Sequence, residues 1–308
     1  MQSDLATTLH QRDCPVCSAH AADAPLFLPA SLDAARLTAS SFASRKAPEF
    51  MSYRLVNCPD CTAVYASEAP GAGALANAYH AADYSSADEA AYAARVYRDR
   101  LEPHLAGLPH RGTALEIGTG TGVFLTALQT LGFAEVVGIE PSPAAIAAAD
   151  PAIAPHIREG IFTGDEYPPG SLSLICCFQT LEHVPDPRGF VEAAFRMLAP
   201  GGMIALITHD YTALLNRLLG KRSPIIDIEH VQLFCPAALR RLVGDAGFAV
   251  RGVETIRNVY PLRYWMSLLP LSARIKQACH ATVRTIGLAE LPVAMNVGNL
   301  LTIGQKPL

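Results

Sequence analysis

The feature that most constrains this chain is an alternation of short apolar stretches with segments of helical periodicity along its C-terminal two thirds. Strands of a parallel sheet that is buried on both faces are apolar at nearly every position, and a helix must connect each strand to the next. The pattern predicts strands at 113–117, 135–139, 156–158, 172–178, 203–208, 248–255 and 299–304, with helices at 123–131, 143–149, 188–198 and 236–246. The sequence therefore predicts an α/β, Rossmann-like fold.

Composition narrows the class of protein. Hydrophobic residues make up 50% of the 308 residues and charged residues 17%, which excludes a chain that is mainly disordered. The net charge of −4 disfavours nucleic acid as a partner. No apolar stretch is long enough to span a membrane, and the start of the chain lacks the apolar core of a secretory signal. We therefore expect a cytoplasmic protein.

Four of the eight cysteines form two similar pairs near the N-terminus, each with the pattern Cys-Pro-x-Cys. The pairs are Cys14 with Cys17 and Cys58 with Cys61. Two such turns supply four thiolates in a tetrahedron, which suits a structural zinc ion with no open coordination position. A redox-active pair is the alternative. The other four, Cys176, Cys177, Cys235 and Cys279, are predicted to be core residues.

The chain divides into three parts. Residues 1–66 are predicted to form the zinc-binding module, because so short a segment buries little core without a metal. Residues 67–111 form a linker with a hinge at 69–73 and a helix at 88–105, and residues 112–308 form the α/β domain. The segment 257–297 interrupts the pattern and is predicted to be a helical insertion. Three interpretations of this insertion remain open: it packs on the domain, it closes the substrate site as a lid, or it lies on a membrane surface.

A glycine-rich turn with an acidic partner points to a nucleotide-type cofactor. Gly118, Gly120 and Gly122 follow the first predicted strand, and Glu140 ends the second. A carboxylate at that place accepts hydrogen bonds from ribose hydroxyls. The spacing Gly-x-Gly-x-Gly departs from the dinucleotide pattern, and Glu116 would repel a pyrophosphate but attract an ammonium group. A ribose joined to a cationic amino acid describes S-adenosylmethionine.

At these residues the sequence resembles the class I S-adenosylmethionine-dependent methyltransferases. Their motifs are matched in order by 115–122, 138–142, 181–187 and 198–202. The resemblance implies a seven-stranded sheet whose last strand, 299–304, is antiparallel. The cofactor-binding residues it implies are Glu116, Gly118, Thr119, Gly120, Gly122, Glu140, Pro141, Ile161, Phe162, Gln179, Thr180 and Leu181. The family often has an acidic residue after the third strand for adenine, whereas this chain has Gly160-Ile161-Phe162.

Three histidines are candidates for a general base that removes a proton from the methyl acceptor. His183 follows the fourth predicted strand, His209 ends the fifth, and His230 lies in a segment that resembles a loop closing over the active site. We prefer His230 as the base, because an imidazole titrates near neutral pH. His183 is interpreted as a residue that packs against the cofactor, and His209 as a polar strand end on the acceptor side.

The expected acceptor is a small molecule. The two cysteine pairs ahead of the domain resemble zinc-binding methyltransferases of sugars and other small metabolites, although their further C-terminal domain is absent from this sequence. The alternatives are an RNA or protein methyltransferase that uses the zinc module as a reader, and a non-catalytic binding protein. Residues 1–66 contain five cations and six carboxylates, which disfavours contact with phosphates. The sequence assigns no oligomeric state.

Overall fold

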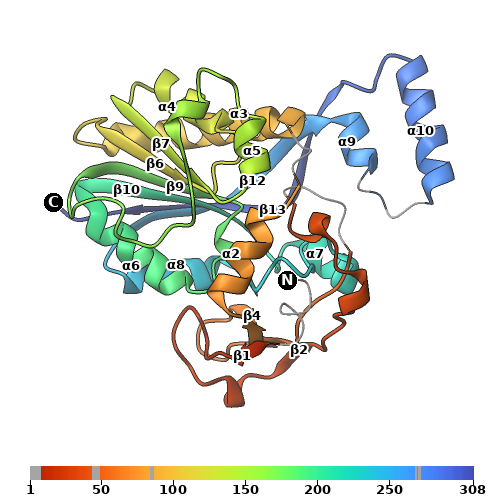
Figure 1. The fold of residues 1–308 in the computed structure, drawn as a ribbon, viewed down its shortest axis with the longest axis horizontal. Helices are drawn as coiled ribbons and strands as arrows, with labels where there is room; N and C mark the ends of the chain where they lie inside the picture. The colour runs from red at the N-terminus through yellow and green to blue at the C-terminus, as the bar shows by residue number, and fades with distance from the viewer. Residues whose placement is uncertain (1–7, 44–48, 84–86, 268, 270–271) are drawn as a thin grey trace.

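A seven-stranded sheet forms the centre of the computed structural model, which describes residues 8–43, 49–83, 87–267, 269 and 272–308 (Figure 1). Its order is β12-β13-β10-β9-β6-β7-β8. The strands are β6 (Thr113–Ile117), β7 (Glu135–Glu140), β8 (Ile157–Glu159), β9 (Leu172–Phe178), β10 (Leu198–His209), β12 (Ala249–Pro261) and β13 (Pro292–Gln305). β13 runs antiparallel to both of its neighbours, β12 and β10, and all other neighbouring strands of this sheet pair in parallel. The predicted Rossmann-like fold with an antiparallel last strand is confirmed.

Helices cover both faces of this sheet (Figure 1). They are α3 (Ala87–Leu101), α4 (Val123–Thr130) and α5 (Pro143–Ala147) on one side, and α6 (Pro187–Met197) and α8 (Pro236–Asp245) on the other. Alternate side chains of β9 enter the two resulting cores, so that Cys176 packs with α3 and α4 while Cys177 packs with α6 and α8. Both cysteines are fully buried, and Cys235 is nearly so. The core predictions for these three cysteines are confirmed. Cys279 is only half-buried and joins no core cluster, so its prediction as a core residue is wrong.

The segment predicted as a helical insertion, 257–297, differs from that prediction at both ends. β12 and β13 pair as far as Asn258↔Met295 and Pro261↔Pro292, so they extend beyond the sheet as a two-stranded ribbon. Among the described residues of this segment, only α9 (Leu262–Ser267) and α10 (Ala273–Thr285), which connect the two arms of the ribbon, are helical. An aromatic cluster stabilises this end: the rings of Tyr260 and Trp265 lie 5.3 Å apart, and Trp265 donates a hydrogen bond to the Val293 carbonyl at 2.9 Å.

The N-terminal part consists of two small sheets. The first pairs β1 (Leu9–Gln11) with β5 (Glu68–Pro70), and the second has the order β11-β4-β3-β2. Its strands are β2 (Leu26–Leu28), β3 (Leu55–Asn57), β4 (Val64–Ala66) and β11 (Gln232–Leu233). β11 comes from the α/β part of the chain, so the two parts share a sheet. The stretch 69–73, predicted as a hinge, spans the end of β5 and the start of α2 (Ala72–His80).

Short helical turns complete the described chain. The 3₁₀ segments are η1 (Ala21–Asp23), η2 (Ala34–Arg36), η3 (Ala39–Phe42), η4 (Glu102–Gly107), η5 (Ala154–His156), η6 (Leu181–His183) and η7 (Gly220–Arg222). One further α-helix, α7 (Leu214–Leu219), precedes η7. η4 continues α3, which therefore ends earlier as an α-helix than the predicted 88–105. Among the described residues, no helix is long and apolar enough to cross a membrane.

Arg12 connects the N-terminal part to the α/β part. Its guanidinium donates to the carbonyls of Pro185 at 2.8 Å and Val231 at 3.3 Å, and to the side-chain oxygen of Gln232 at 3.1 Å. Burial lowers the pKa of Arg12 to about 10, which leaves it charged at neutral pH. A half-buried cation with three oxygen acceptors fixes the position of the first module on the second.

Replacing Arg12 with Met should destabilise the protein by about 2–3 kcal/mol, because three oxygens lose a charged donor. Urea denaturation followed by circular dichroism measures the change. Arg240→Met is the matched control, since Arg240 is exposed and the change there should stay within about 0.5 kcal/mol. Equal midpoints for the two variants would contradict the role given to Arg12.

Candidate active site

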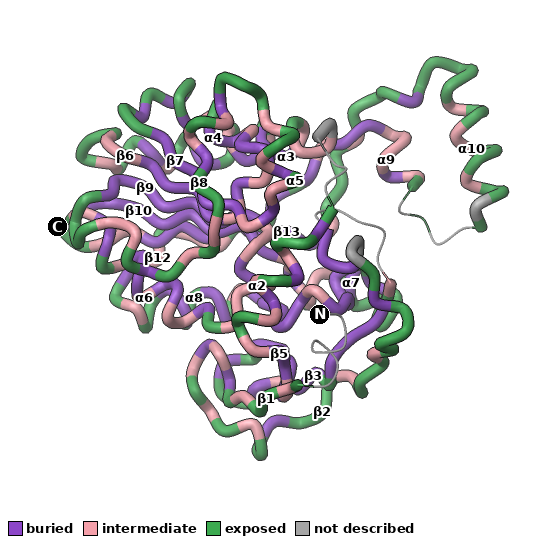
Figure 2. Tube along the Cα trace, in the orientation of Figure 1, coloured by how far each residue is buried: buried purple, intermediate pink, exposed green. Residues whose placement is uncertain are grey.

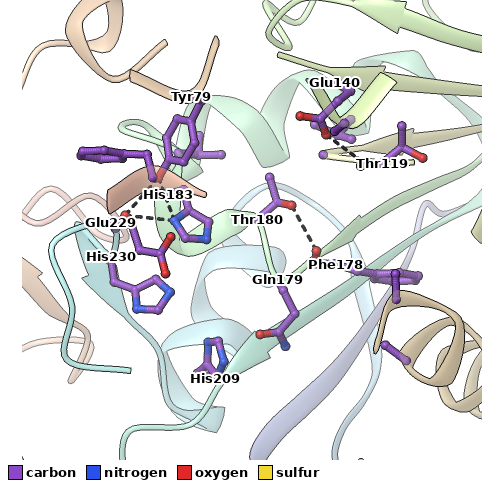
Figure 3. Close-up of a pocket in the computed structure, with 18 of the residues that line it drawn as sticks. Tyr79, Thr119, Glu140, Phe178, Gln179, Thr180, His183, His209, Glu229 and His230 are labelled. Carbon is purple, nitrogen blue, oxygen red and sulfur yellow. Dashed lines mark hydrogen bonds between the residues drawn. The ribbon is translucent and has the colours of Figure 1, made fainter. Parts of the chain in front are cut away.

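A large cavity opens where the parallel strands end. Its volume is about 960 Å³, and its walls run from the glycine-rich turn after β6 to the ribbon of β12 and β13. Figure 3 shows Glu140 and Thr119 on one side of it and three histidines on the other. Ligands of parallel α/β sheets bind at this edge, where strand order reverses. The cavity therefore has a half near the glycines and a half near the histidines.

The glycine-rich turn takes a backbone shape that other residues adopt only with strain. Gly118, Gly120 and Gly122 have φ values of +74°, +58° and +72°. A Cβ on Gly118 would lie 2.2 Å from the hydroxyl of Thr180, and one on Gly122 would lie 2.6 Å from Ile153. A Cβ on Gly120 would meet no atom within 4 Å. The backbone at Gly120 is therefore open to a ligand in the cavity, whereas Gly122 is packed and does not line it.

Two buried carboxyl groups flank this turn. Glu116 ends β6 and accepts a hydrogen bond from the hydroxyl of Thr119. Burial raises the pKa of Glu116 to about 8, and the charge of Glu140 adds to the shift against the effect of Thr119. Glu140 accepts backbone hydrogen bonds from Gly120 at 2.7 Å and Ser142 at 2.9 Å, and burial raises its pKa. Each oxygen of Glu140 retains a lone pair for a ligand.

The other residues predicted to bind the cofactor take different positions. Pro141 and Phe162 line the cavity, and Phe162 packs on Phe190 with ring centroids 4.8 Å apart. Ile161 also lines it and is 48% exposed, which places it at the rim. Leu181 is fully buried and does not line the cavity.

Gln179 combines backbone strain with an unpaired amide. Its φ is +54°, which is uncommon for a residue other than glycine, and its backbone N–H donates to Ile207 at 2.7 Å. The side-chain nitrogen is buried and has no partner among the described residues, although Gln179 lines the cavity. Thr180 follows it and donates to the Phe178 carbonyl at 3.1 Å (Figure 3). A buried amide donor at a cavity wall is available to a ligand atom.

Glu182 holds His209 in place. Its carboxylate, which is fully buried, accepts hydrogen bonds from the backbone N–H of His209 at 2.5 Å and from Nδ1 of the ring at 3.1 Å. Burial alone would raise the pKa of Glu182, but the hydrogen bonds and charge of His209 outweigh it and lower the pKa. With Nδ1 donating to a carboxylate, Nε2 of His209 carries the lone pair. This is the arrangement of a general base with an orienting acid.

The other two histidines are held by neutral oxygens. Nδ1 of His183 lies 2.9 Å from the hydroxyl of Tyr79 and 2.9 Å from the Glu229 carbonyl, and burial lowers the pKa of His183 (Figure 3). Nδ1 of His230 lies 2.9 Å from the Ile225 carbonyl. The ring of His230 is 4.8 Å from that of His183 and 5.3 Å from that of His209. The fold thus brings all three predicted histidines to one wall of the cavity.

The half of the cavity near the histidines is largely apolar. Its apolar lining includes Phe42, Leu75, Leu219, Tyr264, Trp265 and Met266. Asn258 and Asn299 add a polar patch: the amide of Asn299 donates to Asn258 at 3.0 Å, and its own oxygen has no partner among the described residues. An apolar molecule with a few polar groups fits such a wall.

Sequence reasoning did not assign roles to several residues of this site. From the sequence, Glu182 is expected to lie beside the methyl group, because it belongs to the loop just after an apolar strand, but it is given no chemical role. Tyr79, Asn258 and Asn299 carried no signal. Tyr79 comes from α2, outside the α/β alternation, and the two asparagines lie on the ribbon and last strand, where they alternate with apolar neighbours.

The four N-terminal cysteines form a cluster away from the cavity. Their Sγ atoms all lie within 4.8 Å of one another, with Cys14–Cys61 at 3.4 Å and Cys17–Cys58 at 3.5 Å. Tetrahedral zinc–thiolate bonds place sulfur atoms about 3.8 Å apart. None of the four lines the cavity. The cluster therefore suits a metal ion that stabilises the fold and does not reach a substrate.

The two cysteine turns share one backbone design. In each, the residue after the second cysteine has a positive φ, at Ser18 (+62°) and Thr62 (+63°), and donates its N–H to the carbonyl of the first cysteine. The Thr62 hydroxyl also lies 3.1 Å from Sγ of Cys235 at the start of α8. The second turn thus packs directly against the α/β part.

Glu116 should make the stability of the ligand-free protein depend on pH. Its carboxyl binds a proton more tightly in the folded protein than in the unfolded chain, with a pKa of about 8 against 4.5. This contribution is complete below pH 4.5 and is lost as the pH rises to about 8, at a cost of a few kcal/mol. Between these two pH values, the urea midpoint should fall less steeply with rising pH for Glu116→Gln than for wild type. Glu102→Gln, at an exposed carboxylate, is the control, and parallel curves for all three proteins would refute the assignment.

Comparisons with known proteins agree with this geometry. A family described as a methyltransferase domain matches residues 89–253, which is more than half of the chain. Ubiquinone biosynthesis O-methyltransferase of Psychrobacter arcticus is 27% identical over 194 residues, which cover 57% of this chain and 73% of that protein. The protein of the same name from Burkholderia vietnamiensis is 36% identical over 115 residues, covering 34% of this chain and 46% of that protein.

Among solved structures, a putative methyltransferase from Bacillus halodurans aligns with 16% identity and a TM-score of 0.48, covering 68% of this chain and 98% of that chain. The matched domain includes the glycine-rich turn, Glu140 and the strand that leads to Glu182. The predicted resemblance is confirmed, and the chain belongs to the class I S-adenosylmethionine-dependent methyltransferases.

Proposed function

We propose that this enzyme transfers the methyl group of S-adenosylmethionine to a hydroxyl oxygen of an apolar small molecule. The observation that carries the proposal is the pairing of His209 with the buried Glu182 at the wall of a largely apolar cavity. Oxygen acceptors of this kind must lose a proton during transfer, so they need a base. The relatives from Psychrobacter arcticus and Burkholderia vietnamiensis are both named O-methyltransferases, which supports oxygen as the acceptor atom.

The residues around the glycine-rich turn suit S-adenosylmethionine. The open backbone at Gly120 admits a ligand, Glu140 has lone pairs for the ribose hydroxyls, and Glu116 suits the ammonium group. Ile161 and Phe162 would hold the adenine, since no acidic side chain follows β8 at that place. When bound, the cofactor supplies an activated methyl group on a sulfonium. The protein therefore needs only to align the acceptor, exclude water and remove one proton.

In this mechanism Nε2 of His209 takes the acceptor's hydroxyl proton. The charge that forms on the imidazole is stabilised by Glu182, which stays ionised because its pKa is lowered. The unpaired side-chain amide nitrogen of Gln179 would orient the acceptor oxygen. The unpaired side-chain oxygen of Asn299 would orient a second polar group of the acceptor. His230, the base preferred from the sequence, has its Nδ1 on a carbonyl and would position the acceptor instead.

Replacing His209 should identify the base. His209→Ala and Glu182→Gln should each lower kcat about 100-fold or more with little change in KM, because a positioned base contributes that much. The assay measures S-adenosylhomocysteine released with catechol, nitrocatechol and a long-chain alkylcatechol as acceptors. Nitrocatechol, whose hydroxyl is more acidic, should lose less activity than catechol in the His209→Ala variant.

Three further variants make this test selective. His183→Ala and His230→Ala should change KM more than kcat, and His110→Ala, at an exposed position, should change neither. A large loss of kcat in His230→Ala with normal turnover by His209→Ala would return the base to His230. Binding of S-adenosylmethionine without methylation of any acceptor would support the non-catalytic alternative.

We further propose that the four-cysteine cluster binds a structural zinc ion and that residues 1–66 serve as a module for the methyltransferase domain at 112–308. The distances among the sulfur atoms and the shared turn design support this assignment. Cysteines that bind zinc as thiolates must stay reduced, which supports a cytoplasmic location.

Removing one ligand should expose the contribution of the metal. Atomic emission should find one zinc ion for each wild-type chain and much less zinc in Cys58→Ser. The variant should also unfold at a lower urea concentration, because its free energy of unfolding falls by several kcal/mol. Cys279→Ser, at a half-buried cysteine outside the cluster, is the control and should match wild type. Full stability of wild type after dialysis against a chelator, with zinc shown to be absent, would refute a structural role.

A further inference from the structure

Helix α7 presents large apolar side chains to solvent beside the cavity. Leu214 is 72% exposed and Leu218 is 75% exposed, whereas Leu215 and Leu219 of the same helix line the cavity. Exposed leucines occur singly on most surfaces, but two adjacent ones on one helical face, next to a binding cavity, mark an interaction site. α7 packs against β13, so the exposed face is fixed relative to the cavity.

The opposite rim of the cavity has the same character. Tyr264 and Trp265 of α9 line the cavity, and Leu269 both lines it and is 46% exposed. Figure 2 shows α10 projecting beyond the sheet with much of its surface exposed. Ile275 in this helix and Ile286 after it are more than half exposed. Apolar side chains from two separate segments thus line the same cavity.

These two segments are strongly cationic in a protein that is acidic as a whole. Residues 211–226 and 262–288 contain no aspartate or glutamate, although the chain carries a net charge of −4. Their cations are Arg217, Lys221, Arg222, Arg263, Arg274, Lys276 and Arg284. Arg263 pairs with Glu89 and Glu290, and none of the other six pairs with a carboxylate among the described residues. Their charge is therefore available to an anionic partner.

We propose that α7 with η7, together with α9 and α10, forms a docking surface for an anionic lipid membrane. Aliphatic side chains interleaved with lysine and arginine suit insertion between acyl chains with the cations at the lipid phosphates. Docking in this way places the cavity entrance at the lipid surface, where an apolar acceptor dissolves. The membrane-surface interpretation of 257–297 is thereby extended to α7 and η7, which add Arg217, Lys221 and Arg222 to the cations of that segment.

Vesicle sedimentation of the full, zinc-loaded chain tests the proposal without reference to catalysis. Wild type should bind vesicles of phosphatidylcholine mixed with phosphatidylglycerol at least tenfold more tightly than phosphatidylcholine alone, and salt should weaken this binding. Leu214→Ser/Leu218→Ser should weaken binding at least tenfold. Lys221→Gln/Arg222→Gln should weaken it roughly thirtyfold, because each cation contributes about 1 kcal/mol near an anionic surface.

Matched controls separate this surface from general effects of charge or hydrophobicity. Leu26→Ser removes a leucine that is 54% exposed in the N-terminal sheet, and Arg100→Gln/Arg240→Gln removes two exposed cations elsewhere. Both should bind vesicles like wild type, and every variant should bind S-adenosylmethionine like wild type.

Two results would overturn the proposal. One is failure of wild type to bind the anionic vesicles, or equal binding by wild type and the Leu214→Ser/Leu218→Ser variant. The other is a dimer in size-exclusion chromatography that this variant converts to monomer without any lipid binding, since a second copy of the chain would then cover the surface.

Discussion

The rest of the site depends on the hydrogen bonds that the buried side chain of Glu182 accepts from His209. Its side chain accepts the backbone and ring N–H groups of His209 at the end of β10, and its carbonyl accepts the Val231 N–H at 3.0 Å. One residue therefore fixes the loop after β9, the end of β10 and the approach to β11. Both hydrogen bonds from His209 converge on one side-chain oxygen, and the other oxygen has no partner among the described residues. Because a buried charge without partners is costly, the contact with His209 holds the loop after β9 and the end of β10 together.

The same arrangement connects the loop after β9 to the cysteine module. Gln232 in β11 donates to the carbonyls of Leu181 and Val184 at 2.7 Å each, and β11 pairs with β4 beside the second cysteine turn. Arg12 contacts both sides of this junction. The cysteine module is therefore part of the scaffold that positions the histidines, although no cysteine reaches the cavity.

Much of the sheet and of the glycine-rich half could be predicted because local patterns specify them. Apolar strands and the spacing of Gly118, Gly120 and Glu140 are readable within a few residues, and the structure places them together. The rest depends on contacts between distant segments. The pairing of β11 with β4, the ribbon beyond Ile256 and the place of Tyr79 follow from tertiary packing, which leaves no periodic trace in so short a stretch.

The ribbon formed by the ends of β12 and β13 has an evolutionary consequence. It carries α9 and α10 outward from the sheet, and the matched methyltransferase domain stops at residue 253, before the ribbon leaves the sheet. Side chains on a ribbon alternate with a period of two, so inserting two residues in each arm preserves which of them face the cavity. Descendants of such a chain can exchange the tip, and with it part of the cavity wall, while the half near the glycine-rich turn stays unchanged.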